Sequence, residues 1–174
     1  MKRRGFTIVE LIVTITIIGI LLTLAVVNVG TTQAKARDDA RISDIESIAS
    51  NLESFYISGT NNSINFARYP TTGLIGSTST ITTNLRDANI NSFLPPGTTD
   101  VTLTFLASTN TGNLPSIQTT AGVTPQPTKD QYIYQPIKTD GSVCVSGDID
   151  CRKYNLFYRL ESDNTVYRWT SKNQ

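Results

Sequence analysis

The chain has 174 residues, about the size of one domain, and its 15 basic and 14 acidic residues give a net charge of +1. It contains no His and only two Cys, which excludes Ser-His-Asp and Cys-His nucleophiles, His-containing metal sites and a Cys-only zinc site. The balanced charge gives no field strong enough to indicate nucleic acid as the main partner.

The N-terminus begins with a short basic segment and continues into a long apolar run. Lys2, Arg3 and Arg4 come first, and Glu10 is the only ionisable side chain from residue 6 to residue 34. As a helix, residues 6–29 would be about 36 Å long, enough to cross a hydrocarbon core of about 30 Å. Because basic flanks stay on the cytoplasmic side, we expect the rest of the chain to lie outside.

Three interpretations compete for this apolar run. A cleaved secretory signal needs a small-x-small cleavage site, and residues 26–30 (Val-Val-Asn-Val-Gly) offer no good one. A plain membrane anchor fits the length but leaves Glu10 unexplained, because a carboxylate in a spanning helix is costly unless it is paired or lies near an interface. The third interpretation gives Glu10 a role.

The segment Gly5-Phe6-Thr7-Ile8-Val9-Glu10-Leu11 resembles the class III signal of the type IV pilin and pseudopilin superfamily. The resemblance implies that a prepilin peptidase cleaves between Gly5 and Phe6 on the cytoplasmic face and methylates the new N-terminus of Phe6. The α-amino group of Phe6 is then a cation that can pair with Glu10 of a neighbouring subunit. Such a pair avoids an unpaired buried carboxylate and sets the subunit register in a filament.

The second half of the N-terminal segment is amphipathic. Apolar residues recur at helical spacings of three and four: Ile42, Ile45, Ile48, Leu52 and Phe55. No Pro interrupts the pattern, and Gly59 is a plausible C-terminal cap. We therefore predict one helix from Phe6 to about Ile57, hydrophobic all round in its first half and with one buried face in its second.

The remaining residues predict a β-sheet head. We expect a short helix around Asn84–Phe93 and strands at Val101–Leu106, Gln131–Lys138, Tyr154–Glu161 and Thr165–Thr170. These strands form an antiparallel sheet packed on the helix, which is an α+β fold of the type IV pilin kind. The domains are a leader at 1–5, a transmembrane and filament-core half-helix at 6–29, an amphipathic half-helix at 30–57 and the head at 58–174.

Two features of the head bear on its chemistry. Cys144 and Cys151 lie between two predicted strands in a disulfide-permissive compartment, so we predict that they are bridged. Asp140, Asp148 and Asp150 lie in or near that loop. Their spacing matches no known calcium loop, so we favour a solvated acidic loop over the alternative, a calcium site.

These features favour a structural protein, because the chain offers no cluster of catalytic carboxylates or activated nucleophile. We expect no enzyme activity and no cofactor. Basic residues alternate with aromatic ones near the C-terminus, which is typical of single-strand nucleic-acid binding or of a sheet with one cationic face, and we favour the sheet.

The resemblance also implies that the protein is first in the membrane and later on the cell surface. We expect a single-pass membrane protein that an ATPase-driven assembly platform extracts into a homo-oligomeric helical filament, a type IV pilus on the cell surface. The alternative is a minor pilin or a pseudopilin in type II secretion or DNA uptake. Many major pilins carry a Pro near the end of the apolar helix, and this chain has none there.

Overall fold

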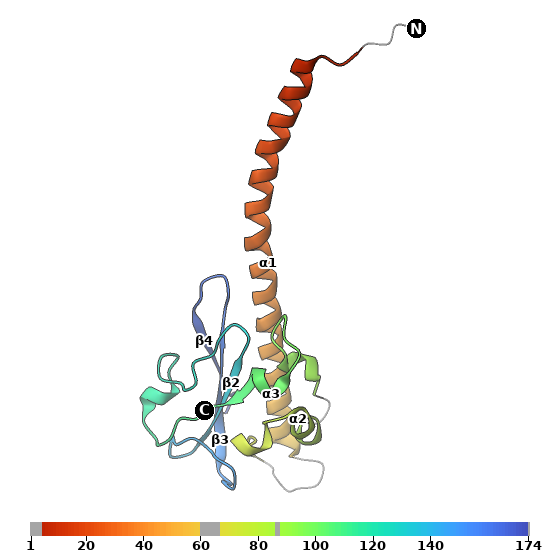
Figure 1. Cartoon of the computed structure of the whole chain (residues 1–174). Coiled ribbons are helices and arrows are strands. Elements are labelled where there is room, and N and C mark those ends of the chain that lie inside the picture. The colour runs from red at the N-terminus through yellow and green to blue at the C-terminus, as the bar shows by residue number, and fades with distance from the viewer. Residues whose placement is uncertain (1–4, 60–66, 86–87, 174) are drawn as a thin grey trace.

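A computed structural model describes the chain except for residues 1–4, 60–66, 86–87 and 174, and leaves out the side chains of residues 24–28 and 74. One long helix, α1 (Ile8–Ser58), carries a small head on its C-terminal half, while its N-terminal half extends away from the head (Figure 1). The predicted α+β, pilin-like fold is confirmed.

Local capping explains where α1 begins and ends. The side chain of Thr7 caps the N-terminus, and Gly59 ends the helix with a φ of 67° while its N–H donates to the carbonyl of Phe55. The predicted bounds are therefore correct to within two residues. The 51 residues make a helix about 77 Å long.

The sheet has four strands in the order β1-β2-β3-β4: β1 (Phe105–Ala107), β2 (Tyr132–Lys138), β3 (Cys151–Arg159) and β4 (Val166–Thr170). The last three are antiparallel neighbours close to their predicted positions, and β2 pairs Ile133 with Phe157. The first pair is parallel, so the predicted antiparallel sheet is in fact mixed. The long connection through η3 (Pro115–Gln118) allows this, because parallel strands need a crossover.

Two predicted elements of the head are wrong in detail. Residues 101–106 alternate as a strand would, but Asp100 accepts the N–H of Thr102 and caps a short helix, α3 (Val101–Thr104), before β1 starts. The helix expected at 84–93 is replaced by α2 (Thr78–Asn84) and the 3-10 turn η2 (Ile90–Phe93). A capping box between Ser77 and Thr80 starts α2 earlier than predicted.

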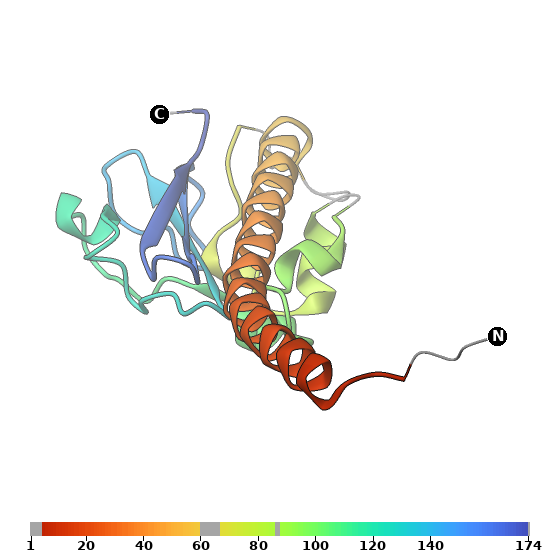
Figure 2. The same cartoon turned by 90° about the horizontal axis from the view of Figure 1, so that it is seen from above.

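The core lies between α1 and the sheet, and α2 and η2 cover another side of the helix (Figure 2). The predicted apolar stripe of α1 is the helix side of this core, with Ile45, Ile48 and Leu52 fully buried. The sheet contributes Tyr132, Tyr134, Tyr154 and Leu156, among others. A second, smaller cluster of Val123, Ile133 and Phe157 lies on the other face of the sheet.

Candidate functional site: the processing segment and the helix–head contact

The predicted cleavage bond lies in exposed, non-helical chain. Residues 5–7 precede α1, and Phe6 is 84% exposed. A Cβ added at Gly5 would meet no described atom within 4 Å. The fold of the described chain therefore does not require Gly at this position.

Glu10 is bound within its own chain by a contact that the sequence analysis missed. Its carboxylate accepts the backbone N–H of Thr7 at 2.9 Å and the hydroxyl of Thr7 at 2.8 Å, while the Thr7 hydroxyl accepts the N–H of Glu10 at 3.3 Å. This reciprocal pair is a capping box, and the spacing Thr-x-x-Glu was the signal that could have revealed it. The predicted partner of Glu10, the Phe6 amine of another subunit, would have to displace Thr7 or share the carboxylate with it.

The N-terminal half of α1 exposes apolar side chains on all sides. The large apolar residues from Ile8 to Leu22 are 50–78% exposed. Hydroxyls in this stretch bond to their own helix, as Thr14 does to the carbonyl of Leu11 and Thr16 to that of Ile12. Within the described residues, no helix combines the length and the apolar character needed to cross a membrane. The side chains of residues 24–28, inside the predicted span of 6–29, lie outside the described part.

The helix meets the head through a charged cluster, which we call the clamp: Arg37, Asp38 and Arg41 of α1 with Glu161 and Ser162 beyond β3. Asp38 accepts the backbone N–H groups of Glu161 and Ser162 at 2.7 and 2.9 Å. The buried Arg41 donates to Asp38 at 2.9 Å, and Arg37 binds Glu161 through two nitrogens. Burial raises the pKa of Asp38, but these amide bonds and Arg41 outweigh it and lower the pKa overall.

Two further carboxylates of α1 dock the sheet. Asp44 accepts the hydroxyl of Tyr132 at 2.9 Å, and burial raises the pKa of Asp44 to about 6, although Tyr132 and Arg41 oppose the rise. Glu53 accepts the hydroxyls of Tyr69 and Tyr154 at 2.9 and 3.2 Å. These contacts fix the sheet on one face of the helix.

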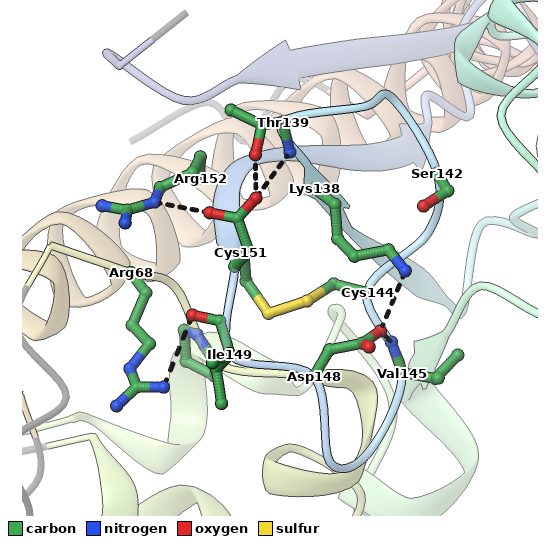
Figure 3. The surroundings of a disulfide bond; sticks show 12 residues. Arg68, Lys138, Thr139, Ser142, Cys144, Val145, Asp148, Ile149, Cys151 and Arg152 are labelled. Atoms are coloured by element: carbon green, nitrogen blue, oxygen red, sulfur yellow. Dashed lines mark hydrogen bonds and ion pairs between the residues drawn. A yellow bond between two sulfur atoms is a disulfide. The ribbon is translucent and has the colours of Figure 1, made fainter.

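The predicted disulfide is present between Cys144, in the connection between β2 and β3, and Cys151, the first residue of β3, with Cα atoms 5.6 Å apart (Figure 3). The surrounding carboxylates do not converge. Asp148 accepts the N–H of Val145 and pairs with Lys138.

The other two carboxylates of this loop also have local partners. Asp150 binds Thr139 and Arg152, and Asp140 binds Ser142. Across the described part of the chain, no group of three or more His, Cys, Asp or Glu side chains could hold a metal ion. The calcium alternative on Asp140, Asp148 and Asp150 therefore finds no support in the geometry.

The basic and aromatic residues near the C-terminus divide between the two sides of the sheet. Tyr154 and Tyr158 are buried on the face that packs against α1, whereas Phe157 is buried on the opposite face, where its register partner Arg168 donates to the carbonyl of Gln118. Tyr167 and Trp169 are partly exposed at the edge strand, 37% and 36%. This arrangement fits the interpretation favoured from the sequence, in which these residues belong to a sheet with one cationic face.

Comparisons with known proteins cover part of the chain. Residues 1–26 match the family described as the prokaryotic N-terminal methylation motif. The type II secretion system core protein G of Dickeya chrysanthemi is 35% identical over 71 residues, which are 41% of this chain and 42% of that protein. The chain thus matches less than half the length of this curated relative. No solved structure gives a significant match.

The chain is therefore a protein with a prepilin-type N-terminus and a pilin-like α+β fold. The resemblance to the type IV pilin and pseudopilin superfamily, first drawn from residues 5–11, is confirmed.

Proposed function

We propose that this chain is a structural pilin subunit that polymerises through α1 into a type IV pilus on the cell surface. The observation that carries the proposal is the exposed apolar half of α1, joined without a break to a folded head. Such a surface is unstable in water and is buried either in lipid or against copies of itself. A bundle of these helices, with the heads outside, satisfies that requirement.

Processing comes before assembly. A prepilin peptidase cleaves the exposed Gly5–Phe6 bond and methylates the Phe6 amine, as the motif at residues 1–26 supports. The subunit waits in the membrane with residues 6–29 in the bilayer and the head outside. An assembly platform driven by an ATPase then moves the helix from lipid into the filament core.

Glu10 has a partner both in the membrane-held subunit and in the filament. In the single chain Thr7 satisfies its carboxylate, which lowers the free-energy cost of holding a charge at the start of an apolar helix. In the filament the Phe6 amine of a neighbouring subunit becomes its partner. The exchange gives the carboxylate a partner at each stage and fixes how far one helix is shifted along the next.

The decisive experiment is electron microscopy of filaments sheared from cells, with mass spectrometry of their subunits. The proposal expects this chain, starting at methylated Phe6, to be the dominant component. A mature N-terminus beyond Val27 would indicate an ordinary signal peptide and contradict the proposal. A bulky residue at Gly5 should leave uncut precursor in the membrane while the head unfolds at an unchanged temperature, because that position contacts no described atom.

A second candidate is a pseudopilin of a type II secretion system. The relative from Dickeya chrysanthemi, a type II secretion system core protein, favours it. Both kinds of subunit would assemble through α1, so the abundance of this chain in sheared surface material distinguishes the two candidates. A pilus subunit dominates sheared surface material, whereas loss of a pseudopilin stops the export of secreted proteins and leaves the surface filaments intact.

A further inference from the structure

On the side away from α1, the sheet faces the segment around η3 (Figure 2), and a hollow of about 210 Å³ opens there. Phe157 of β3 belongs to the small apolar cluster on this face, so Asn155 and Lys153, two and four positions earlier, point the same way. Arg168 of β4 is the register partner of Phe157 and shares the face. Lys153, Asn155 and Arg168 all line the hollow, which we call the outer hollow.

The two cations at the outer hollow are not neutralised by the chain itself. No Asp or Glu is among the described residues that line it. The ammonium group of Lys153 has no hydrogen bond or ion pair to a described residue, and Arg168 donates to a neutral acceptor, the carbonyl of Gln118, at 2.6 Å. Lys138 and Arg152 of the same sheet differ, because each is paired with a carboxylate. The outer hollow therefore keeps two uncompensated positive charges.

Bonds within the chain hold the outer hollow in shape before any ligand arrives. The side-chain amide of Gln118 donates to the carbonyl of Gly141 at 2.8 Å, which fixes the segment that orients Arg168. Asn155 is only 4% exposed, and its side-chain amide donates to the side chain of Gln135 at 3.1 Å. A preformed site loses little conformational freedom on binding, so a few polar contacts can hold a ligand.

The spacing of the two cations decides which ligand they can share. Arg168 lies beside Phe157, four residues from Lys153, so their Cα atoms are about 13 Å apart along the strand. Two long side chains can reach one small group over Asn155 from its two ends. A carboxylate or a phosphodiester brings one negative charge, whereas a terminal phosphate group brings close to two near pH 7 and has oxygens for both cations. The charge and the spacing therefore favour a terminal phosphate.

A second hollow on the other side of Arg168 leaves space for whatever carries the phosphate. It has a volume of about 370 Å³, and Thr119, Thr120, Val166 and Tyr167 line it together with Arg168. Among the described residues of this lining there is again no carboxylate. A ligand larger than free phosphate can thus place its phosphate in the outer hollow and its remaining atoms beside the two threonines.

We propose that the outer hollow binds a doubly charged phosphate group, with Lys153 and Arg168 as its two charged contacts. The group is either free phosphate or the terminal phosphate of an ester. This site goes beyond the proposed structural role, because neither polymerisation through α1 nor processing at Gly5 uses this face of the sheet.

The test is a phosphorus NMR titration of the full-length protein in detergent, at pH 7.5 and constant ionic strength with chloride as the background anion. Inorganic phosphate should bind with a dissociation constant on the order of 1 mM. Lys153→Gln and Arg168→Gln should each raise that constant roughly tenfold, since each removes a charge-assisted hydrogen bond. Arg168→Lys keeps the charge and should retain part of the binding.

Lys172→Gln is the matched control. It removes the same charge just beyond the end of β4, but Lys172 lines a different hollow, beside Glu46 and Glu53. It should bind phosphate like the unaltered protein. The unfolding temperature without phosphate shows whether each variant has kept its fold. Absence of phosphate binding, or equal weakening by Lys172→Gln and by Lys153→Gln in folded protein, would overturn the site.

Glucose 1-phosphate distinguishes the two sources of the phosphate group. Tighter binding than that of inorganic phosphate, lost in Arg168→Gln, identifies an ester as the ligand, and equal binding identifies free phosphate. If glucose without phosphate competes equally well, the phosphate site is wrong. The titration requires no filament, so its failure leaves the proposed function intact, and a chain that forms no filament can still show the site.

Discussion

Glu10 is satisfied in the single chain by one neighbour, Thr7, through two short hydrogen bonds. Both donors belong to the residue immediately after Phe6, so the carboxylate lies close to the bond that processing would cut. The proposed amine of another subunit adds a full positive charge that Thr7 cannot supply. Charge-assisted hydrogen bonds are roughly twice as strong as neutral ones, which favours the exchange on assembly.

We predict that Glu10→Leu allows insertion and cleavage but impairs assembly. The neighbouring amine would be buried unpaired or would lose its proton, a penalty of about 3–5 kcal/mol in a dry site. Glu10→Gln keeps the shape without the charge and should be nearly as defective. The measurement compares membrane-held with sheared subunit. Thr16→Val, another loss of polarity in the same half-helix, is the control, and normal filament yield from Glu10→Leu would rule out the register role.

Asp44 is expected to make stability depend on pH. Its pKa is raised to about 6 in the folded chain from an ordinary 3.8, so the folded state binds more protons than the unfolded state between these values. Its stabilising contribution is therefore complete below about pH 4 and is lost as the pH rises through 6. Asp44→Asn keeps an acceptor for Tyr132 and removes the titration.

The measurement is thermal unfolding of the full-length protein in detergent at pH 4.5 and 7.5. The difference between Asp44→Asn and the unaltered protein isolates Asp44 from groups such as Asp38, whose lowered pKa acts in the opposite direction. Asp44→Asn should gain stability relative to the unaltered protein as the pH rises. A constant difference across this range would show that Asp44 does not titrate there.

At the scale of the elements, the clamp joins α1 to the β3–β4 hairpin through groups of very different exposure. Asp38 and Arg41 are almost fully buried, whereas the side chains of Arg37 and Glu161 are 39% and 25% exposed. Buried charges that lose a partner are strongly destabilising, and exposed pairs contribute little. The inner pair is therefore the important one for holding the hairpin on the helix.

We predict that Asp38→Ala lowers the free energy of unfolding by about 3 kcal/mol, at the low end for a broken buried pair because Glu161 remains near Arg41. The two amides of the hairpin turn also lose their acceptor. Arg37→Ala, which removes the more exposed pair between Arg37 and Glu161, should change the free energy of unfolding by less than about 1 kcal/mol. Denaturant unfolding measures both, and similar losses from the two variants would contradict this division of roles.

The disulfide gives the second prediction at this scale. Cys144→Ser opens a loop of eight residues and should lower the free energy of unfolding by about 2.5 kcal/mol on the chain-entropy model. Surface filament should decrease while leader cleavage is unchanged, because the Gly5–Phe6 bond is at the other end of the molecule (Figure 1). Peptide mapping that found both thiols free in native protein would contradict the disulfide itself.

The elements also show where sequence patterns suffice. The helical spacing of the apolar residues from Ile42 to Phe55 predicted the second half of α1, because that stripe is buried against the sheet, and β2 and β4 lie close to the predicted strands. At residues 101–106 the alternation of side chains failed as a guide, since the cap by Asp100 favoured a helical turn locally. The parallel pairing of β1 depends on contacts between distant segments, and the clamp likewise joins residues more than a hundred positions apart.

The molecule combines an N-terminal half of α1 that exposes apolar side chains with a head that packs against the C-terminal half of the same helix. Cleavage after Gly5 would change the net charge of the molecule. Removal of Lys2, Arg3 and Arg4 with the leader leaves 12 basic against 14 acidic residues, a side-chain net charge of −2 instead of +1. We predict this shift for surface material, together with a mass that begins at methylated Phe6. Intact-mass analysis and isoelectric focusing check it, and full-length chain in the filament would exclude cleavage.

Because α1 runs unbroken from its free end into the head, each subunit of a filament pulled along its axis would carry its share of the load along one continuous helix. The head is attached along the side of that helix, so tension would act on the clamp and on the tyrosine–carboxylate bonds in shear, with many bonds sharing the force at once. Bonds loaded side by side resist far more force than bonds opened one after another. The attachment of each head to α1 would therefore resist axial tension through all of these bonds at once.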